Sequence, residues 1–203
     1  MSRTVSQPVG TAEAETDRKI VLVQVDRDTL SLAVEIQQQI WPDNPPDRDY
    51  LDKVRHPKDP RNVTWLVYHK DKLIGLTGLF SYDKDEMGYD YGESVWMDWF
   101  AILPDWRRQG FGEKVLRATI ERAQAIGGPV RYFRVDTADY PDRASTKLYD
   151  KVMQRRESYT AEPMPEGHTG LIYTFCLGKS GFKSWGNRLL DLGRYDAIEG
   201  TVH

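Results

Sequence analysis

The chain has 203 residues, of which 39% are hydrophobic and 29% charged, a composition typical of a folded globular protein rather than a disordered one. Its net charge of −3 gives no basic footprint for nucleic acid, and the sequence has no run of about 18 apolar residues to cross a membrane. Cys176 is the only cysteine, which excludes an internal disulfide and a paired-cysteine zinc or redox motif, so we expect a protein of the reducing cytoplasm.

The first quarter of the sequence predicts a polar tail, a strand and a helix. Residues 1–18 lack the apolar core of a signal peptide, and we expect a disordered tail there. Alternating apolar residues predict a strand over 19–26, and a helical apolar period predicts an amphipathic helix over 26–41. Three prolines then end the helix in a Pro/Asp-rich elbow, and a short helix is predicted over 47–55.

The middle of the chain predicts strands, followed by alternating helices and strands. Strands over 63–69 and 72–82 are joined tightly enough to form an antiparallel hairpin. A loop over 83–93 carries five acidic residues and leads into an apolar strand over 94–103. Further along, helices are predicted over 112–126 and 142–153, and strands over 130–135, 155–162 and 170–177.

Residues 103–112, which read Leu-Pro-Asp-Trp-Arg-Arg-Gln-Gly-Phe-Gly, connect the predicted strand to the long helix. Gly110 and Gly112 let the backbone approach a ligand closely, and the first helical turn presents N–H groups at the positive end of the helix dipole. Arg107 and Arg108 add fixed positive charge. The segment therefore predicts a phosphate-binding turn, although a glycine pair between a strand and a helix is also ordinary turn chemistry.

Spacing excludes two common phosphate motifs. A dinucleotide fingerprint needs a third glycine where Val115 stands, and the Gly-Lys-Ser at 178–180 lacks the earlier glycine of a P-loop because Tyr173 occupies its position. What remains is Arg-x-x-Gly-x-Gly, read from Arg107, Gly110 and Gly112. Here the sequence resembles the GNAT superfamily of N-acetyltransferases, in which the pyrophosphate of acetyl-CoA lies on such a turn.

The resemblance covers roughly residues 19–178 and implies both a fold and a donor site. The implied fold is α/β (α+β), with a mixed, mostly antiparallel central sheet of about seven strands and helices on both faces. It also implies acetyl-CoA as co-substrate, with backbone pairing to its pantetheine arm. The residues implied to contact the donor are Phe100, Ala101 and Ile102 on the strand, and Arg107, Arg108, Gln109, Gly110, Phe111, Gly112 and Glu113 on the turn.

Asp98 is the candidate base. It is the only charged residue in an apolar run, and a carboxylate there is costly to bury unless it is paired or functional. It lies nine residues before Arg107, where many members of the resembled family carry a glutamate that binds or deprotonates the amine. A structural salt bridge is the alternative role. Glu93 is a second candidate base, and Trp41 in the elbow is a candidate substrate contact.

Tyr149 is the candidate acid. Residues 142–151 resemble the family's second motif, Asn-x-x-Ala-x-x-Leu-Tyr-x-Lys, whose tyrosine protonates the departing thiolate. The pKa values of a phenol and a thiol lie close, at about 10 and 8.5, so this proton transfer is nearly balanced. Packing of the helix on the sheet is the alternative role. Asp142 and Ser145 depart from the motif, which has Asn and Ala at these positions.

These residues predict an N-acetyltransferase that moves an acetyl group from acetyl-CoA directly to a primary amine of a small molecule or a peptide. The acidic loop favours a cationic acceptor. Two alternatives stay open: a non-catalytic acyl-CoA-binding regulatory protein of the same fold, and transfer of a longer acyl group or from a carrier protein. We expect no nucleic-acid or membrane partner.

The remaining polar residues and the C-terminus carry less information. Four histidines, His56, His69, His168 and His203, lack metal-ligand spacing, so we expect surface or capping roles and no metal. Residues 179–203 lie outside the resemblance. Their apolar residues predict a short helix that docks on the same chain or on a second subunit in a homodimer.

Overall fold

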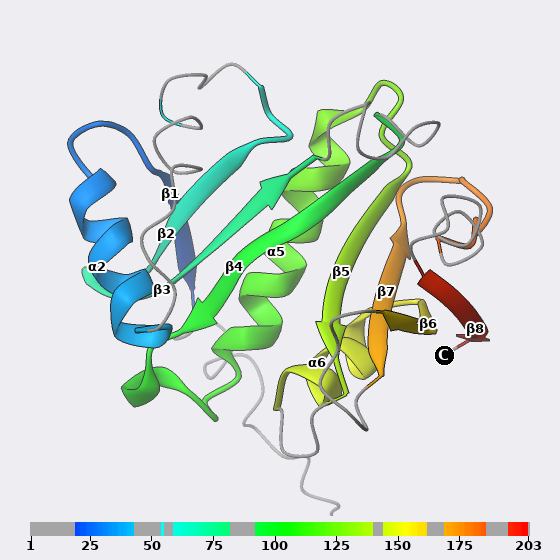
Figure 1. Ribbon diagram of the computed structural model, residues 1–203. Coiled ribbons are helices and arrows are strands. Elements are labelled where there is room, and N and C mark those ends of the chain that lie inside the picture. Colours follow the sequence, from blue (N-terminus) through cyan, green and yellow to red (C-terminus); the bar gives the residue numbers. More distant parts are fainter. Residues whose placement is uncertain are drawn as a thin grey trace, which may run out of the picture.

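The computed structural model describes residues 19–42, 54, 59–81, 92–139, 144–161, 169–185 and 195–202 (Figure 1). The strands are Ile20–Gln24 (β1), Val63–His69 (β2), Lys72–Phe80 (β3), Ser94–Ile102 (β4), Tyr132–Ala138 (β5), Arg155–Ala161 (β6), Gly170–Cys176 (β7) and Tyr195–Val202 (β8). The helices are Leu30–Ile40 (α2), Phe111–Ile126 (α5) and Ala144–Val152 (α6), with a 3-10 turn at Pro104–Trp106 (η2). The strands form one sheet in the order β1-β2-β3-β4-β5-β7-β6-β8.

Helices cover both faces of this sheet (Figure 1). The apolar side of α2 packs on Leu66 and Leu76, which are register partners on β2 and β3. On the opposite face, Leu116 of α5 packs with Val95 and Phe133, and α6 joins the same cluster. Each helix thus buries one apolar stripe. All neighbouring strands are antiparallel except β4 and β5, so the predicted mixed fold is confirmed.

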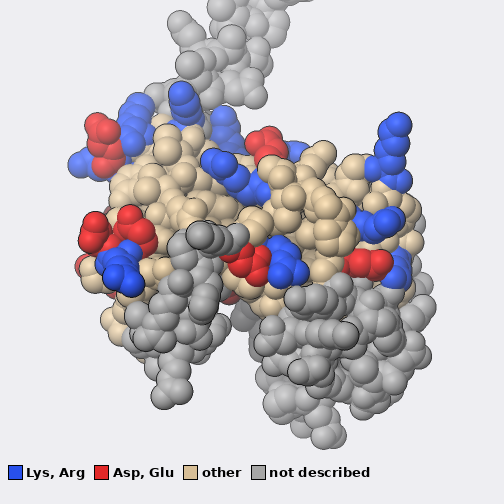
Figure 2. Space-filling view, turned by 90° about the horizontal axis from the view of Figure 1, so that it is seen from above, with Lys and Arg blue, Asp and Glu red and all other residues tan. Residues whose placement is uncertain are grey.

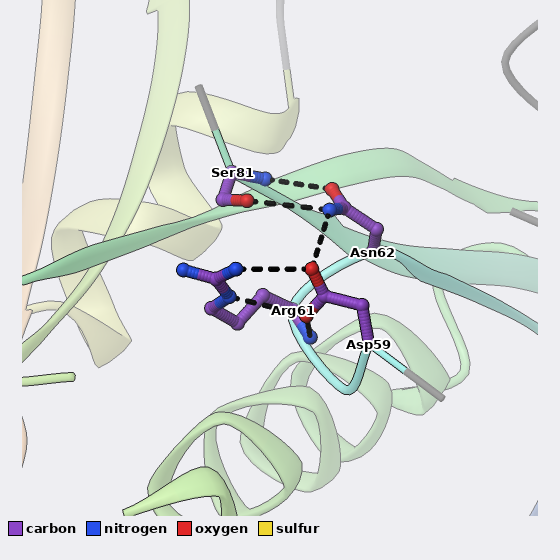
Figure 3. A network of polar contacts seen from close by, with 4 residues as sticks. All are labelled: Asp59, Arg61, Asn62 and Ser81. Carbon is purple, nitrogen blue, oxygen red and sulfur yellow. Dashed lines mark hydrogen bonds and ion pairs between the residues drawn. The ribbon is translucent and has the colours of Figure 1, made fainter. Parts of the chain in front are cut away.

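The β2–β3 hairpin is fixed at both of its ends. Lys70, at φ 53°, makes the tight turn. At the open end, the side-chain amide of Asn62 donates to the Ser81 hydroxyl (3.3 Å) and accepts from the Ser81 N–H (3.0 Å), as Figure 3 shows. Asp59 accepts from Arg61 and Asn62. Burial raises the pKa of Asp59, but hydrogen bonds and the charge of Arg61 outweigh it, so the pKa is lowered and the carboxylate stays ionised.

A bulge interrupts the pairing of β4 with β3, and β4 also separates from β5. Gly78 pairs with Asp98 and Leu76 with Ala101, so two β4 residues, Trp99 and Phe100, stand opposite one β3 residue. Trp99 has φ 38°, a conformation costly for a bulky side chain. On the other side of β4, the last register pair with β5 is Trp96 with Arg134, and beyond it the two strands diverge (Figure 1). We call the opening between β4 from Met97 onward and β5 from Val135 onward the fork.

The C-terminal extension contributes a strand. The resemblance implied about seven strands; the described residues form these seven and an eighth, β8, which pairs antiparallel with β6. The edge of β6 otherwise presents unpaired N–H and C=O groups, and β-branched residues such as Ile198 and Val202 favour the extended chain that satisfies them. The tail over 1–18, the helix expected over 47–55 except Val54, most of the acidic loop, and residues 186–194 lie outside the described residues.

Candidate functional site

The turn between β4 and α5 is braced by its own side chains. Arg107 Nε donates to the carbonyl oxygen of Ile102 (2.8 Å), and Gln109 Nε2 donates to the carbonyl oxygen of Asp105 (2.8 Å). Arg108 and Gly110 adopt left-handed φ values of 59° and 83°. Arg107 and Gln109 therefore shape the turn, whereas the exposed side chain of Arg108 is available to a ligand.

The first turn of α5 presents backbone N–H groups. Gly110 is the N-cap residue and, as a glycine, has no side chain to cap them. The first four N–H groups of a helix have no intrahelical partner, and the dipole is positive there. Phe111 is 3% exposed and packs in the core with Ile102, so of the residues predicted to bind the donor, Phe111 can contribute only its backbone.

A buried histidine supports this turn from β2. His69 is 6% exposed, and its ring centroid lies 4.8 Å from that of Phe111 and 5.7 Å from that of Trp106. Its Nδ1 lies 2.8 Å from the carbonyl oxygen of Lys19. The expected surface or capping role of His69 is thus wrong, because the end of β2 lies against the turn.

Glu113 joins α5 to α6. Its carboxylate oxygens lie 2.6 Å from Lys151 Nζ and 3.0 Å from Arg117 Nη2. The hydrogen bond from Lys151 lowers the pKa of Glu113. Lys151 and Arg117 therefore occupy the side chain of Glu113, a predicted donor contact. The backbone N–H of Glu113 is the group that remains for a phosphate.

Tyr149 lies beside the fork on the α5 face of the sheet. Close packing of α6 on α5 sets its place: a Cβ added at Gly112 would stand 3.4 Å from Leu148 Cδ2. Tyr149 is 5% exposed, and its ring centroid lies 6.4 Å from that of Phe100 and 5.3 Å from that of Tyr173. The structure thus brings together Tyr149, the candidate acid, and Phe100, a candidate donor contact.

A polar network next to Tyr149 was not predicted. The Tyr173 hydroxyl donates to Asp150 Oδ1 (2.9 Å), and Arg156 Nη1 donates to the same oxygen (3.1 Å). Burial, with the hydrogen bond to Asp150, raises the pKa of Tyr173 to about 12. Tyr173 therefore stays protonated and ties β7 to α6 at the residue after Tyr149. The sequence does not show that these residues are neighbours, because they lie on three different elements, α6, β6 and β7, that come together only in the folded chain.

Asp98 lies on the opposite face, the face that α2 covers. It stands across from Gly78 on β3, which has no side chain to fill the adjacent space. The bulge turns Trp99 to the same face, where it packs in the cluster under α2. The ring centroids of Trp99 and Trp41 lie 5.2 Å apart in a T-shaped contact. Trp41, a predicted substrate contact, thus packs on Trp99, the residue after Asp98, which the sequence did not single out.

Glu93 is not part of this group. It lies just before β4, and its Oε2 is 2.7 Å from Lys183 Nζ. Its carbonyl oxygen accepts hydrogen bonds from the N–H groups of Arg131 and Tyr132. Asp98 lies five residues further along an extended strand, about 16 Å away. Glu93 therefore sits at the closed end of the β4–β5 pair, away from the fork.

Two glycines of β3 allow close approach to its neighbours, Gly75 to β4 and Gly78 to β2. A Cβ at Gly75 would lie 2.1 Å from the carbonyl oxygen of Ala101, and one at Gly78 would lie 2.8 Å from that of Val63. Real Cβ atoms do not approach this closely. The signal was present in the sequence, since a glycine inside a strand often marks a close backbone approach. Ala101 and Ile102, 7% and 8% exposed, are held by this contact.

The sequence matches the Acetyltransferase (GNAT) family over residues 28–153, a range that contains the fork, the turn and Tyr149. The chain belongs to the GNAT acetyltransferase family. Its described strands and helices follow the order that the resemblance implied. No curated protein matches the sequence significantly.

Solved structures share the GNAT fold at low sequence identity. A GNAT-family acetyltransferase from Streptococcus pneumoniae aligns with a TM-score of 0.60 at 15% identity, over 79% of this chain and 100% of that one. The acetyl-CoA complex of Arabidopsis thaliana NAA60 gives 0.57 at 16% identity, over 78% and 100%. A spermidine N-acetyltransferase chimera from Vibrio cholerae and hSSAT gives 0.58 at 17% identity, over 77% and 94%.

The surface of this GNAT protein adds little to the site. Lys and Arg side chains are interspersed with Asp and Glu on the described part of the face shown in Figure 2, without a patch of one sign. No helix within the described ranges is both long and apolar enough to cross a membrane. The same residues hold no group of three or more His, Cys, Asp or Glu side chains suited to a metal ion.

Proposed function

We propose that this GNAT protein is an N-acetyltransferase that moves an acetyl group from acetyl-CoA to a primary amine of a small molecule or a peptide, in one complex of enzyme, donor and acceptor. The observation that carries the proposal is the fork. Beyond Trp96, the edge of β4 that faces β5 has no strand partner among the described residues. This open edge leads to the glycine turn at the start of α5. An open strand edge beside a row of helix N–H groups suits a ligand with amide and phosphate groups.

The chain fits the donor at three places. The N–H groups at the start of α5 and the guanidinium of Arg108 would hold the pyrophosphate. The backbone of Phe100, Ala101 and Ile102 would pair with the amides of the pantetheine arm, as an added strand would. Gly112 would let the phosphates approach the helix, since a larger side chain would meet Leu148 or the ligand.

The proposed acid and base lie on opposite faces of the sheet, with the fork between them. Acetyl-CoA supplies an acyl group activated as a thioester. Asp98 takes a proton from the ammonium group, directly or through water, so that the amine nitrogen can bond to the acetyl carbon. Tyr149 gives its proton to sulfur as the carbon–sulfur bond breaks. The amine thus arrives from the α2 face, which favours direct transfer without an acyl-enzyme.

The proposed acceptor is a cationic amine. The Asp98 carboxylate attracts an ammonium group, and an indole ring beside it adds a cation–π contact. Trp99 and Trp41 are half-buried at this point, next to each other. Because a spermidine N-acetyltransferase chimera is among the similar structures, polyamines are the first acceptors to test. We place the reaction in the cytoplasm, which the single cysteine favours.

The test is acetyl transfer to a panel of polyamines, aminoglycosides, amino sugars and lysine peptides, followed by release of the free thiol. We expect turnover with at least one cationic class. Tyr149→Phe should lower kcat roughly a hundredfold while the Kd for acetyl-CoA stays nearly unchanged. Gly112→Leu should weaken acetyl-CoA binding in calorimetry. Tight acetyl-CoA binding with no turnover on any amine would favour the non-catalytic alternative, and absence of acetyl-CoA binding would overturn the proposal.

A further inference from the structure

A buried arginine stands where β4 and β5 separate. Arg134 on β5 is 0% exposed and is the register partner of Trp96, the last pair before the fork. Its guanidinium joins three other parts of the chain: Nε donates to Ser94 Oγ on β4 (3.0 Å), Nη1 to Thr174 Oγ1 on β7 (2.7 Å) and Nη2 to the carbonyl oxygen of Lys183 (2.9 Å). A single side chain thus connects both arms of the fork to the C-terminal extension.

Glu157 on β6 completes this arrangement. It is 3% exposed, and its Oε2 lies 3.8 Å from Arg134 Nη1. The carboxylate accepts the N–H of Trp185 (2.9 Å) and the hydroxyl of Ser184. A buried ion pair is costly unless further hydrogen bonds satisfy it, and here residues 183–185 supply them. These residues lie beyond the family match at 28–153.

Trp185 carries this contact to the proposed base. It is 2% exposed, its ring lies 4.9 Å from that of Trp96 at 76°, and the Arg134 guanidinium stacks over it at 5.3 Å. Trp96 precedes Asp98 by two residues on a regular part of β4, so both side chains point to the same face. The position of Trp96 therefore sets the position of Asp98.

We propose that residues 183–185 form a C-terminal clamp that fixes the closed end of the fork, with Trp185 as a positioning residue for Asp98. Only three register pairs join β4 to β5, so their separation needs side-chain support. The clamp supplies it by closing over Arg134 and Trp96, opposite the face on which α5 packs. This inference rests on the proposed function for its kinetic consequences, but not for its structural ones.

The kinetic test uses Trp185→Ala, with Phe182→Ala as the matched control because Phe182 is an aromatic residue just before the clamp that is 36% exposed. Small misplacement of a reacting group lowers rates steeply, so Trp185→Ala should lower kcat roughly tenfold or more, with little change in the KM for acetyl-CoA. Trp185→Phe should restore most of the rate, and Phe182→Ala should resemble wild type. Lower thermal stability with unchanged kcat would show a purely structural role and overturn the proposal.

Hydrogen exchange of the β4 amides tests the clamp without any substrate. Exchange at residues 96–98 should be faster in Trp185→Ala than in wild type or Phe182→Ala. If Trp185→Ala does not fold, Ser184→Ala, which removes only the hydroxyl bonded to Glu157, should give a smaller change of the same kind. Unchanged exchange in both variants would overturn the clamp. If wild type acetylates no amine, the proposed function fails, whereas faster exchange would still support the clamp.

Discussion

The donor and acceptor halves of the proposed site are built in different ways. The proposed donor half is one continuous segment, residues 100–113, and it would act through backbone groups, those of the turn being arranged by the left-handed φ values of Arg108 and Gly110. The proposed acceptor half comprises Asp98 and Trp99 on β4 and Trp41 after α2, and it would act through side chains. Donor binding should therefore respond to changes that move the backbone, and acceptor chemistry to changes of a functional group.

The proposed acid and the proposed base also lie on different faces of the sheet. Tyr149 lies among aromatic rings on the α5 face, whereas Asp98 lies on the α2 face. Family members can thus share the turn and the tyrosine while differing on the α2 face, where the acceptor would bind. A variant that damages one half and leaves the other intact is the sharpest test of this division.

Asp98→Asn should give the largest effect, on the acceptor half alone. The amide keeps the size of the side chain but cannot take a proton, so kcat should fall by about a hundredfold or more. The Kd for acetyl-CoA in calorimetry should stay as in wild type, because no donor contact is changed. Glu93→Gln is the control and should leave kcat nearly unaltered, since Glu93 lies at the closed end of the strand pair. A weakened donor Kd in Asp98→Asn would show that the halves are not separate.

Gly75→Ala should give the next largest effect, on the donor half. The added methyl group would meet the Ala101 carbonyl oxygen at 2.1 Å, so β4 must move at the residues proposed to pair with pantetheine. Overpacking of this kind costs about 1–3 kcal/mol in stability, and we expect a similar loss in acetyl-CoA binding. Gly181→Ala is the control, because a Cβ there meets nothing within 4 Å. Urea denaturation and calorimetry on both variants measure the effect, and intact donor affinity in Gly75→Ala would contradict it.

The sequence predicted the continuous parts of the molecule well. Strands β1 to β7 and helices α2, α5 and α6 were foreseen within a few residues, because apolar periodicity and glycine or proline breaks are local signals. The turn was foreseen for the same reason. The mixed, mostly antiparallel sheet came with the family resemblance, whereas the pairing order of the strands was not predicted, since periodicity does not say which strands are neighbours.

The parts that sequence reasoning missed depend on contacts between distant segments. The bulge that turns Trp99 beside Trp41 leaves no local pattern, because its register is set by β3. The burial of Arg134 and Glu157 has no local signal, and residues 183–185 form hydrogen bonds with both side chains. A short helix was expected within 179–203, but residues 195–202 pair with the open edge of β6 as β8.

Removal of the Glu113–Lys151 pair should have the smallest effect, a small loss of stability where α5 and α6 meet at the donor half. The pKa of Glu113 is lowered below its usual range, first by the hydrogen bond from Lys151. Its contribution to stability is therefore present above the unfolded-state pKa and is lost as pH falls through the lower, folded-state pKa. Glu113→Gln should thus be slightly less stable than wild type in urea at neutral pH, with the difference shrinking in acid and at high salt, because the pair is partly exposed. Glu121→Gln, exposed on the same helix, should show no such dependence.

If the stability difference between wild type and Glu113→Gln grows in acid, the direction of the pKa shift assigned to Glu113 is wrong. A large loss of acetyl-CoA affinity in Glu113→Gln would mean that the Glu113 side chain, and not only its backbone, takes part in the donor half.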